Sequence, residues 1–158
     1  WLDSVAGNWQ VNGIATYSTG TPLVGVSASN NTFSMGGGQR ANIAGDARLN
    51  GGRSTSEKLS QWFDTTVFSQ PAQFTFGNSP RLFTNVRNDG PTNIDFSIFK
   101  EFPIGESKRI EFRAEAFNLC NTPQFGSPGT GFGAGTFGVV ASQANTPRQM
   151  QLGLKIVY

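Results

Sequence analysis

The amino-acid sequence predicts an all-β fold, an antiparallel meander of about four long strands joined by long glycine-rich loops. Apolar and polar residues alternate with period two in four separate segments, which is typical of strands with two different faces. The 158 residues include 20 glycines and 14 phenylalanines, and only 14% of them are charged, a composition unlike that of a solvated helical protein. No run of apolar residues reaches the length of about 18 that a transmembrane helix needs.

The first strand is expected near residues 8–19, in the segment NWQVNGIATYS, where every second residue from Trp9 onwards is apolar, aromatic or small. The second strand is expected near residues 92–102, where TNIDFSIFKEF alternates between apolar and polar residues and ends at Phe102. The segment between them, residues 20–91, contains many glycines and prolines and is expected to form a long loop.

The third strand is expected near residues 109–118, in the segment RIEFRAEAF. Its Arg, Ala and Glu residues are good helix formers, but its apolar residues would spread around a helix without forming a stripe, so the alternation favours a strand. The fourth strand is expected near residues 148–158, where Met150 and every second residue after it are apolar. A second long loop is expected over residues 119–147.

The connections between these strands differ in length. The turn PIGESK between the second and third strands is short, whereas the other two connections are long. Short periplasmic turns and long extracellular loops are typical of outer-membrane β-barrels, and strands of roughly 9 to 11 residues can cross a bilayer at a tilt. We therefore expect transmembrane strands that contact the lipid bilayer of the bacterial outer membrane, with the short turn on the periplasmic side.

The two faces of the strands predict two environments. The apolar face is expected to meet lipid, with aromatic residues at the membrane interfaces. This aromatic girdle consists of Trp9, Tyr17, Phe102 and Tyr158. The polar face is expected to line a water-filled lumen. The charged residues assigned to the lumen are Asp95, Glu101, Arg109, Glu111, Arg113 and Glu115.

The charges also predict how the second and third strands pair. If Glu101 lies opposite Arg109, then Ser97 lies opposite Arg113 and Asp95 opposite Glu115. A shift by two residues would instead place Glu101 opposite Glu111, and like charges that face each other across strands repel. We therefore predict the register in which Glu101 pairs with Arg109.

The sequence contains few residues of catalytic or metal-binding type. It has no histidine, and its single cysteine, Cys120, excludes an intrachain disulfide and is expected to be a small apolar residue at a strand end. GAGTFG at residues 133–138 matches a dinucleotide-binding pattern but lacks the strand before it and the helix after it. We expect no enzyme activity, no cofactor and no metal site. The net charge of +2, with scattered basic residues, predicts no nucleic-acid partner.

The first long loop is rich in aromatic residues, which either bind a sugar or peptide ligand or pack against one another. We favour self-packing, because closely spaced aromatic residues usually build a small core of their own. These residues are Phe33, Trp62, Phe63, Phe68, Phe74, Phe76 and Phe83.

The segments FRAEAFNLCNTPQFG and ANTPRQMQLGLKIVY together resemble the C-terminus of the Oar-like TonB-dependent outer-membrane transporters. GNWQVNGIATYSTGTPL, WFDTTVFSQPAQFTFGNSPR and NIDFSIFKEF are similar to upstream parts of the same family. The resemblance implies a barrel of about 22 strands with a plug in its lumen. The chain would then be the last four strands of this barrel and would take part in the uptake of a solute.

The resemblance also implies partners. The plug and the segment that contacts the TonB complex would belong to an N-terminal region, and the remaining barrel strands would pair with this chain. The end of the chain resembles the signal that the barrel-assembly machinery reads, an aromatic last residue preceded by alternating apolar residues. The residues in this signal are Leu152, Leu154, Ile156 and Tyr158.

Two other folds are compatible with the sequence. One is a secreted soluble β-sandwich that binds carbohydrate or another ligand, and the other is a small complete barrel of about eight strands. A sandwich must bury its alternating apolar faces, whereas a piece of a membrane barrel leaves them exposed as one continuous surface. The eight-stranded barrel fits the chain length, but the sequence contains only four convincing membrane strands.

Overall fold

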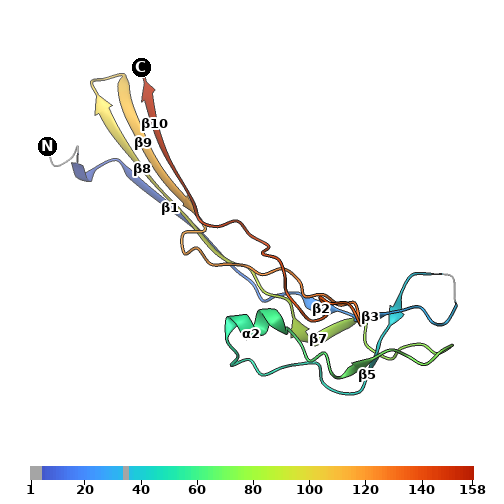
Figure 1. The fold of residues 1–158 in the computed structure, drawn as a ribbon. Coiled ribbons are helices and arrows are strands. Elements are labelled where there is room, and N and C mark those ends of the chain that lie inside the picture. The colour runs from blue at the N-terminus through green and yellow to red at the C-terminus, as the bar shows by residue number, and fades with distance from the viewer. Residues whose placement is uncertain (1–4, 34–35) are drawn as a thin grey trace. The chain divides into compact units, whose positions relative to one another are not determined.

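The computed structural model describes residues 5–33 and 36–158. The chain forms two compact units, both drawn in Figure 1. One unit consists of Trp1–Ser18, Pro91–Gln124 and Asn145–Tyr158, and we call it the sheet unit. The other consists of Thr19–Gly90 and Phe125–Ala144, and we call it the loop unit. The two long connections predicted from the sequence therefore contribute to one common structure.

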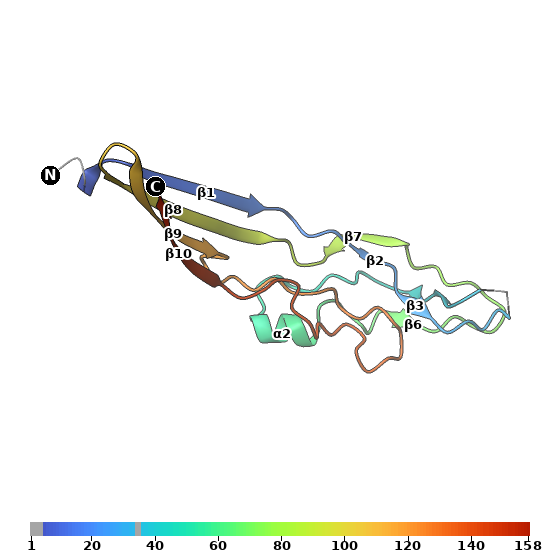
Figure 2. The same cartoon turned by 90° about the horizontal axis from the view of Figure 1, so that it is seen from above.

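The sheet unit contains four long antiparallel strands. They are β1 (Trp9–Tyr17), β8 (Thr92–Ile104), β9 (Lys108–Phe117) and β10 (Gln149–Val157). Their order in the sheet is β1-β8-β9-β10, as Figure 2 shows. Each of these long strands therefore lies beside the next long strand in the chain. All four predicted strands are present. The β8–β9 hairpin extends farther toward its turn than the alternation predicted.

The register of β8 and β9 differs from the prediction. Glu101 lies opposite Glu111 rather than Arg109, and Ser97 lies opposite Glu115 rather than Arg113. The last pair before the turn is Ile104 with Lys108. The turn therefore consists of residues 105–107.

Turn geometry explains this register. Gly105 is the first residue of the turn and has φ of 77°, a conformation that glycine adopts without the steric cost of a side chain. A Cβ built on Gly105 would meet no atom within 4 Å, so the requirement for glycine is conformational and not one of space. The predicted register would have needed a turn over residues 104–106, with Gly105 at its centre.

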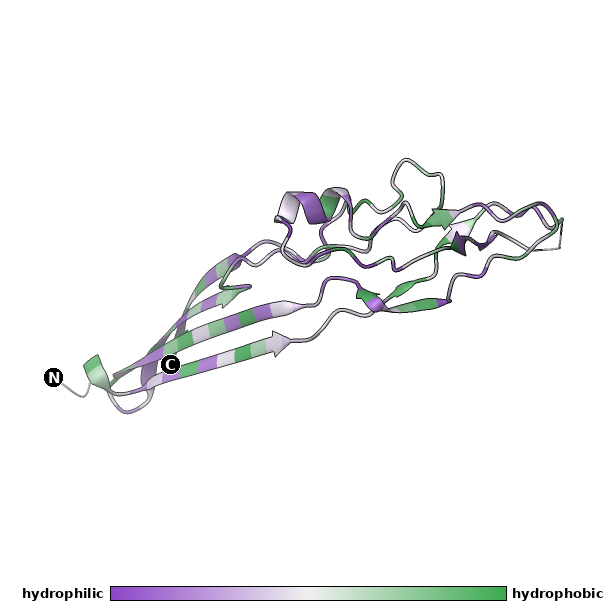
Figure 3. Cartoon of the chain, turned by 90° about the horizontal axis from the view of Figure 1, so that it is seen from below, coloured by the Kyte–Doolittle hydropathy of each residue, from purple (hydrophilic) through white to green (hydrophobic). Residues whose placement is uncertain are grey.

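The register keeps the alternation in phase across all four strands. Directly paired residues of an antiparallel sheet lie on the same face, and Val11 pairs with Ile98, which pairs with Ala114, which pairs with Leu152. Figure 3 shows the resulting bands of hydrophobic and hydrophilic residues along the strands. We call the side that carries these four residues the apolar face and the opposite side the polar face.

The loop unit has its own secondary structure, where the sequence predicted only loops. In the described residues it contains short paired strands and one six-residue helix, α2 (Thr55–Ser60). The strand pairs are β2 (Pro22–Val24) with β7 (Leu82–Arg87), β3 (Ser27–Ala28) with β4 (Gln39–Arg40), and β5 (Asn42–Ile43) with β6 (Phe68–Ser69). No helix of the described residues is long and apolar enough to cross a membrane.

Aromatic side chains form the core of the loop unit. Phe63 is fully buried, and its ring lies 5.7 Å from that of Phe68 and 5.3 Å from that of Phe137, in edge-to-face geometry. Phe137 belongs to the GAGTFG segment, so that segment contributes to a hydrophobic core. Phe83 is also buried, and Trp62 packs against the core. Self-packing is therefore confirmed for Trp62, Phe63, Phe68 and Phe83.

The other three loop aromatics are not part of this core. Phe33, Phe74 and Phe76 are 76%, 69% and 76% exposed. Phe33 and Phe74 contact each other, with their ring centroids 5.5 Å apart. Both have positive φ, 54° and 63°, a conformation that is uncommon for residues other than glycine. Phe33 and Phe74 therefore pack on each other as predicted but outside the core, whereas Phe76 is exposed.

A capping box begins helix α2. The Ser54 side chain accepts a hydrogen bond from the backbone N–H of Glu57, and the Glu57 carboxylate accepts one from the Ser54 backbone at 2.7 Å. The Ser54 hydroxyl also donates to this carboxylate at 2.6 Å. The hydroxyl, followed by the backbone N–H of Ser54, lowers the pKa of Glu57, because both hydrogen bonds favour the ionised carboxylate.

Candidate functional site

The polar face of the sheet gathers the charged residues that were assigned to the lumen. All six lie on this face of β8 and β9, and whether the face lines a lumen stays a prediction. They are Asp95, Glu101, Arg109, Glu111, Arg113 and Glu115. Strand β10 adds Lys155, which pairs with Glu111, and Gln151, which pairs with Glu115. The polar face therefore carries carboxylates and cations on neighbouring strands.

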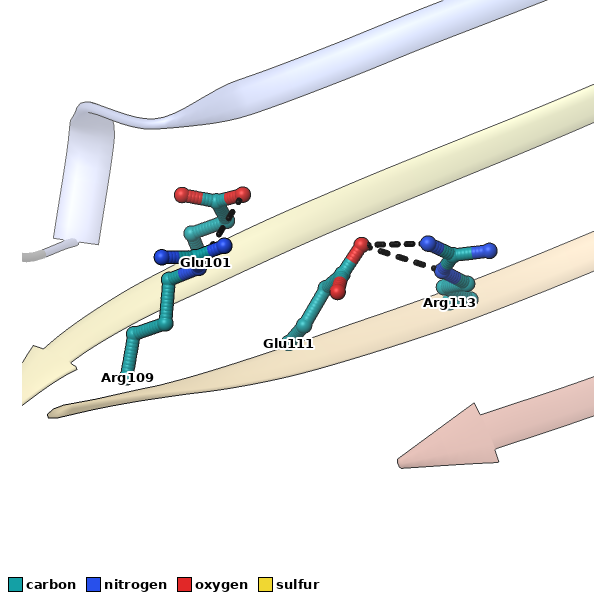
Figure 4. A network of polar contacts seen from close by, with 4 residues as sticks. All are labelled: Glu101, Arg109, Glu111 and Arg113. Atoms are coloured by element: carbon teal, nitrogen blue, oxygen red, sulfur yellow. Dashed lines mark hydrogen bonds and ion pairs between the residues drawn. The ribbon is translucent and has the colours of Figure 1, made fainter. Parts of the chain in front are cut away.

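Two arginines offset the repulsion between Glu101 and Glu111. The guanidinium of Arg109 lies 3.9 Å from the Glu101 carboxylate, diagonally across the hairpin. Arg113 lies on the same strand as Glu111 and donates to its carboxylate at 2.6 Å. Figure 4 shows the four side chains, with each arginine beside one glutamate. Because each carboxylate has its own cation, the opposition of two glutamates is tolerated.

Polar and aromatic contacts continue along this face beyond the ion pairs. The Gln151 amide donates a hydrogen bond to the Glu115 carboxylate across β9 and β10. The Arg113 guanidinium also lies 5.2 Å from the centre of the Phe99 ring, on the neighbouring strand. Since these groups are partly exposed, they provide hydrogen-bond donors and acceptors to a polar solute and contribute little to stability.

Asp95 has a different environment from the other five charged residues. Its carboxylate accepts hydrogen bonds from the Asn93 side chain at 2.8 Å and from the backbone N–H of Asn118 at 2.9 Å. Asn118 follows directly after β9 and has φ of 51°. Asp95 therefore fixes the end of the hairpin opposite the turn.

The two segments that carry the family resemblance are hydrogen-bonded to each other at this end of the sheet. The Asn118 side chain donates to the backbone oxygen of Thr146 at 3.1 Å. The Asn121 side chain accepts from the backbone N–H of Arg148 at 2.9 Å, and Arg148 donates to the backbone oxygen of Leu119 at 3.3 Å. The FRAEAFN and NTPRQ sequences thus connect the end of β9 to the start of β10, and their first role is structural.

The apolar face of the sheet is uncovered. On β10, Met150, Leu152, Leu154 and Ile156 are 71%, 73%, 70% and 64% exposed. Exposed apolar areas of this kind on soluble monomers rarely exceed a few hundred Å². The soluble sandwich is therefore contradicted, since it required these side chains to be buried. The closed eight-stranded barrel is contradicted as well, because in the described residues β1 and β10 each pair with a neighbour on one side only.

Lys100 is a buried charge on the apolar face, and none of the sequence-based predictions included it. It is 1% exposed, and its ammonium donates to the backbone oxygens of Val5, at 3.3 Å, and of Gly7. The same ammonium lies 5.1 Å from the centre of the Trp9 ring and 5.3 Å from that of Phe102. The signal was present in the sequence, because Lys100 interrupts the apolar alternation of its strand.

The four residues of the predicted girdle lie at the ends of the apolar face. Trp9 and Phe102 lie beside Lys100, near the β8–β9 turn, whereas Tyr17 pairs with Thr92 at the opposite end of the sheet. Tyr158 follows Val157, which pairs with Arg109 next to the same turn. These positions are compatible with an aromatic girdle.

The described residues contain no group of three or more His, Cys, Asp or Glu side chains that could hold a metal ion. Cys120 lies beyond the end of β9, as expected, but it is exposed and not buried as an apolar residue would be.

Comparison with known proteins supports a membrane fold. A family model described as an outer membrane beta barrel domain matches residues 1–151. The match covers residues of both units and extends into the start of β10. No match was found among curated proteins or among solved structures.

Proposed function

Because this chain belongs to the outer membrane beta barrel domain family, we propose that it forms four adjacent strands of a TonB-dependent, Oar-like transporter that takes up a solute. The chain lies in the bacterial outer membrane and contacts the lipid bilayer. The observation that supports a transport role is the polar face of the sheet, where charged side chains of three adjacent strands, Glu101, Arg109 and Lys155, are exposed. In a barrel such a face lines the lumen.

In this proposal the wall is passive. The polar face provides a hydrated path, while a plug supplied by an N-terminal region opens and closes it under the control of the TonB complex. The apolar face meets lipid, and Trp9, Tyr17, Phe102 and Tyr158 lie at the membrane interfaces. Leu152, Leu154, Ile156 and Tyr158 form the signal recognised by the barrel-assembly machinery.

Cysteine labelling in the outer membrane tests the lumen assignment. The variants Glu111→Cys and Phe112→Cys place a thiol on adjacent residues of β9 that face opposite sides of the sheet. Both are made in a Cys120→Ser background in the complete gene product. In isolated outer membranes, where the reagent reaches the wall from both sides of the membrane, a small cationic thiol reagent should label the Glu111→Cys variant. It should leave the Phe112→Cys variant unlabelled, because a thiol in lipid does not ionise. Equal labelling would refute the assignment.

The same variant tests the dependence on TonB. In living cells, labelling of the Glu111→Cys variant from the outside should require both TonB and the proton-motive force, because the plug blocks the lumen at rest. A protonophore and a TonB deletion should each reduce labelling to the level of the Phe112→Cys variant. Labelling that is unchanged in the TonB deletion would contradict a gated transporter and would indicate a passive channel.

A further inference from the structure

The loop unit contains a cavity of about 370 Å³, within the usual size range of sites for small molecules. Its walls come from the segment between residues 48 and 62, which includes α2, from β7, and from Phe125 of the second long connection. All of these residues belong to the loop unit. The cavity is therefore a feature of this unit alone.

The cavity concentrates positive charge. Four cationic side chains line it, namely Arg48, Arg53, Lys58 and Arg87. The loop unit has six Lys and Arg residues in all, so most of its cations meet here. Asp89 is the one carboxylate among the described lining residues, and it accepts a hydrogen bond from the backbone N–H of Phe125 at 2.8 Å. The ion pairs closer than 4.0 Å in the described residues both lie in the sheet unit, so the only carboxylate effect on these cations in the described chain is the weaker electrostatic attraction between Arg53 and Glu57.

Backbone oxygens hold two of the guanidinium groups in place. Arg53 donates to the oxygens of Asn50 at 3.1 Å and of Gln61 at 2.5 Å, and Arg87 donates to that of Gly20 at 2.7 Å. A guanidinium has five N–H donors, so these contacts leave donors for a ligand. Charged groups that are fixed before binding lose less conformational entropy when a ligand arrives.

The remaining wall is apolar and partly aromatic. Leu59, Trp62, Val86 and Phe125 line the cavity beside the cations. The indole N–H of Trp62 donates to the backbone oxygen of Arg87 at 2.8 Å, which fixes the ring next to that arginine. A ligand that satisfies both walls carries acidic groups on an apolar or planar body.

We propose that this cavity binds a small soluble organic anion with two or more acidic groups on an apolar or aromatic body. The inference goes beyond the proposed transport function and does not depend on it, because the cavity lies within the loop unit. Binding and uptake are measured separately. A protein that binds the anion but shows no TonB-dependent labelling would refute the transport proposal and leave this one intact.

Isothermal titration calorimetry with phthalate, an aromatic dicarboxylate, tests the proposal. The complete gene product is purified from outer membranes in detergent, and phthalamide serves as the uncharged probe of the same shape. The variants Arg48→Gln and Lys58→Gln each remove a charged group whose side chain makes no hydrogen bond within the described residues. Each should weaken phthalate binding about tenfold, the effect of losing one charge-assisted hydrogen bond. Circular dichroism confirms that the variants fold like the parent protein.

Matched controls remove charge elsewhere in the same unit. Arg40 and Arg81 are exposed and line a different cavity, so Arg40→Gln and Arg81→Gln should leave phthalate binding unchanged. Equal weakening by the controls would overturn the proposal in favour of general electrostatic attraction. The proposal is also overturned if phthalate and citrate show no saturable binding at about 10 mM. Tight binding of phthalamide, or binding of lipopolysaccharide vesicles in place of the soluble anions, would overturn it too.

Discussion

Lys100 connects the apolar face of the sheet to the segment that precedes β1. Burying an ammonium group costs free energy unless its charge and its donors are satisfied, and here two backbone oxygens and two aromatic rings satisfy them. The aliphatic stem adds apolar contact to the same face. Lys100 therefore holds the entry of the chain into β1 against β8.

Replacing Lys100 with methionine keeps the apolar stem but removes the charge. The Lys100→Met variant should lower the free energy of unfolding by about 2 kcal/mol, because hydrogen bonds from a charged donor are lost and two backbone oxygens lose their partner. Urea unfolding in detergent measures this change. Lys108 lies on the same face and is exposed, so Lys108→Met should cost much less. Equal losses in the two variants would show that Lys100 has no special role.

The sequence predicted the four long strands because alternation with period two is a local property that each segment carries by itself. The register of β8 and β9 could not be predicted in the same way. It depends on where the turn places Gly105 and on Arg109 and Arg113 reaching residues that are not directly opposite them. The rule that like charges avoid each other considers only directly opposed pairs, and here the neighbouring arginines outweigh it.

Disulfide formation distinguishes the two registers. In the structure Ser97 lies opposite Glu115, so the double variant Ser97→Cys and Glu115→Cys should form a disulfide on mild oxidation in a Cys120→Ser background. The double variant Ser97→Cys and Arg113→Cys tests the register predicted from charge. Its two Cα atoms would be about 8 Å apart, which is too far for a disulfide. Mass spectrometry of proteolytic fragments measures both products, and preferential crosslinking of the second pair would contradict the observed register.

At the scale of the whole molecule, local sequence patterns such as alternation did not predict the structure of the loop unit. The sequence predicted two long loops, but residues of both contribute to the core of the loop unit, where Phe137 of the second connection packs against Phe63 of the first. The cationic cavity is likewise built from residues that are distant in the sequence. Its basic residues are scattered between positions 48 and 87 and form no run, so only the fold brings them together. Alternation describes a strand, whereas a core or a cavity depends on contacts between distant segments.

The exposed apolar face and the sheet edges β1 and β10, which are unpaired in the part of the chain that the structure describes, determine how the isolated 158-residue chain behaves. Exposed apolar surface and open strand edges both promote self-association in water. We expect the isolated chain to form large oligomers in buffer and to recover β structure as a monomer in detergent, as measured by size exclusion and circular dichroism. A monomer that unfolds cooperatively in water would contradict the lipid-facing role of the apolar face.

A matched pair of variants on β10 tests whether the apolar face or the unpaired strand edges cause the self-association of the isolated chain. Replacing Leu152, Leu154 and Ile156 with serine removes exposed apolar side chains and leaves the strand edge in place. Replacing Gln151 and Lys155 with serine changes the opposite face of the same strand. If the apolar face drives association, the first variant should shift the chain toward smaller species in buffer, and the second should elute like the parent. Identical elution of all three chains would assign the association to the open edges alone.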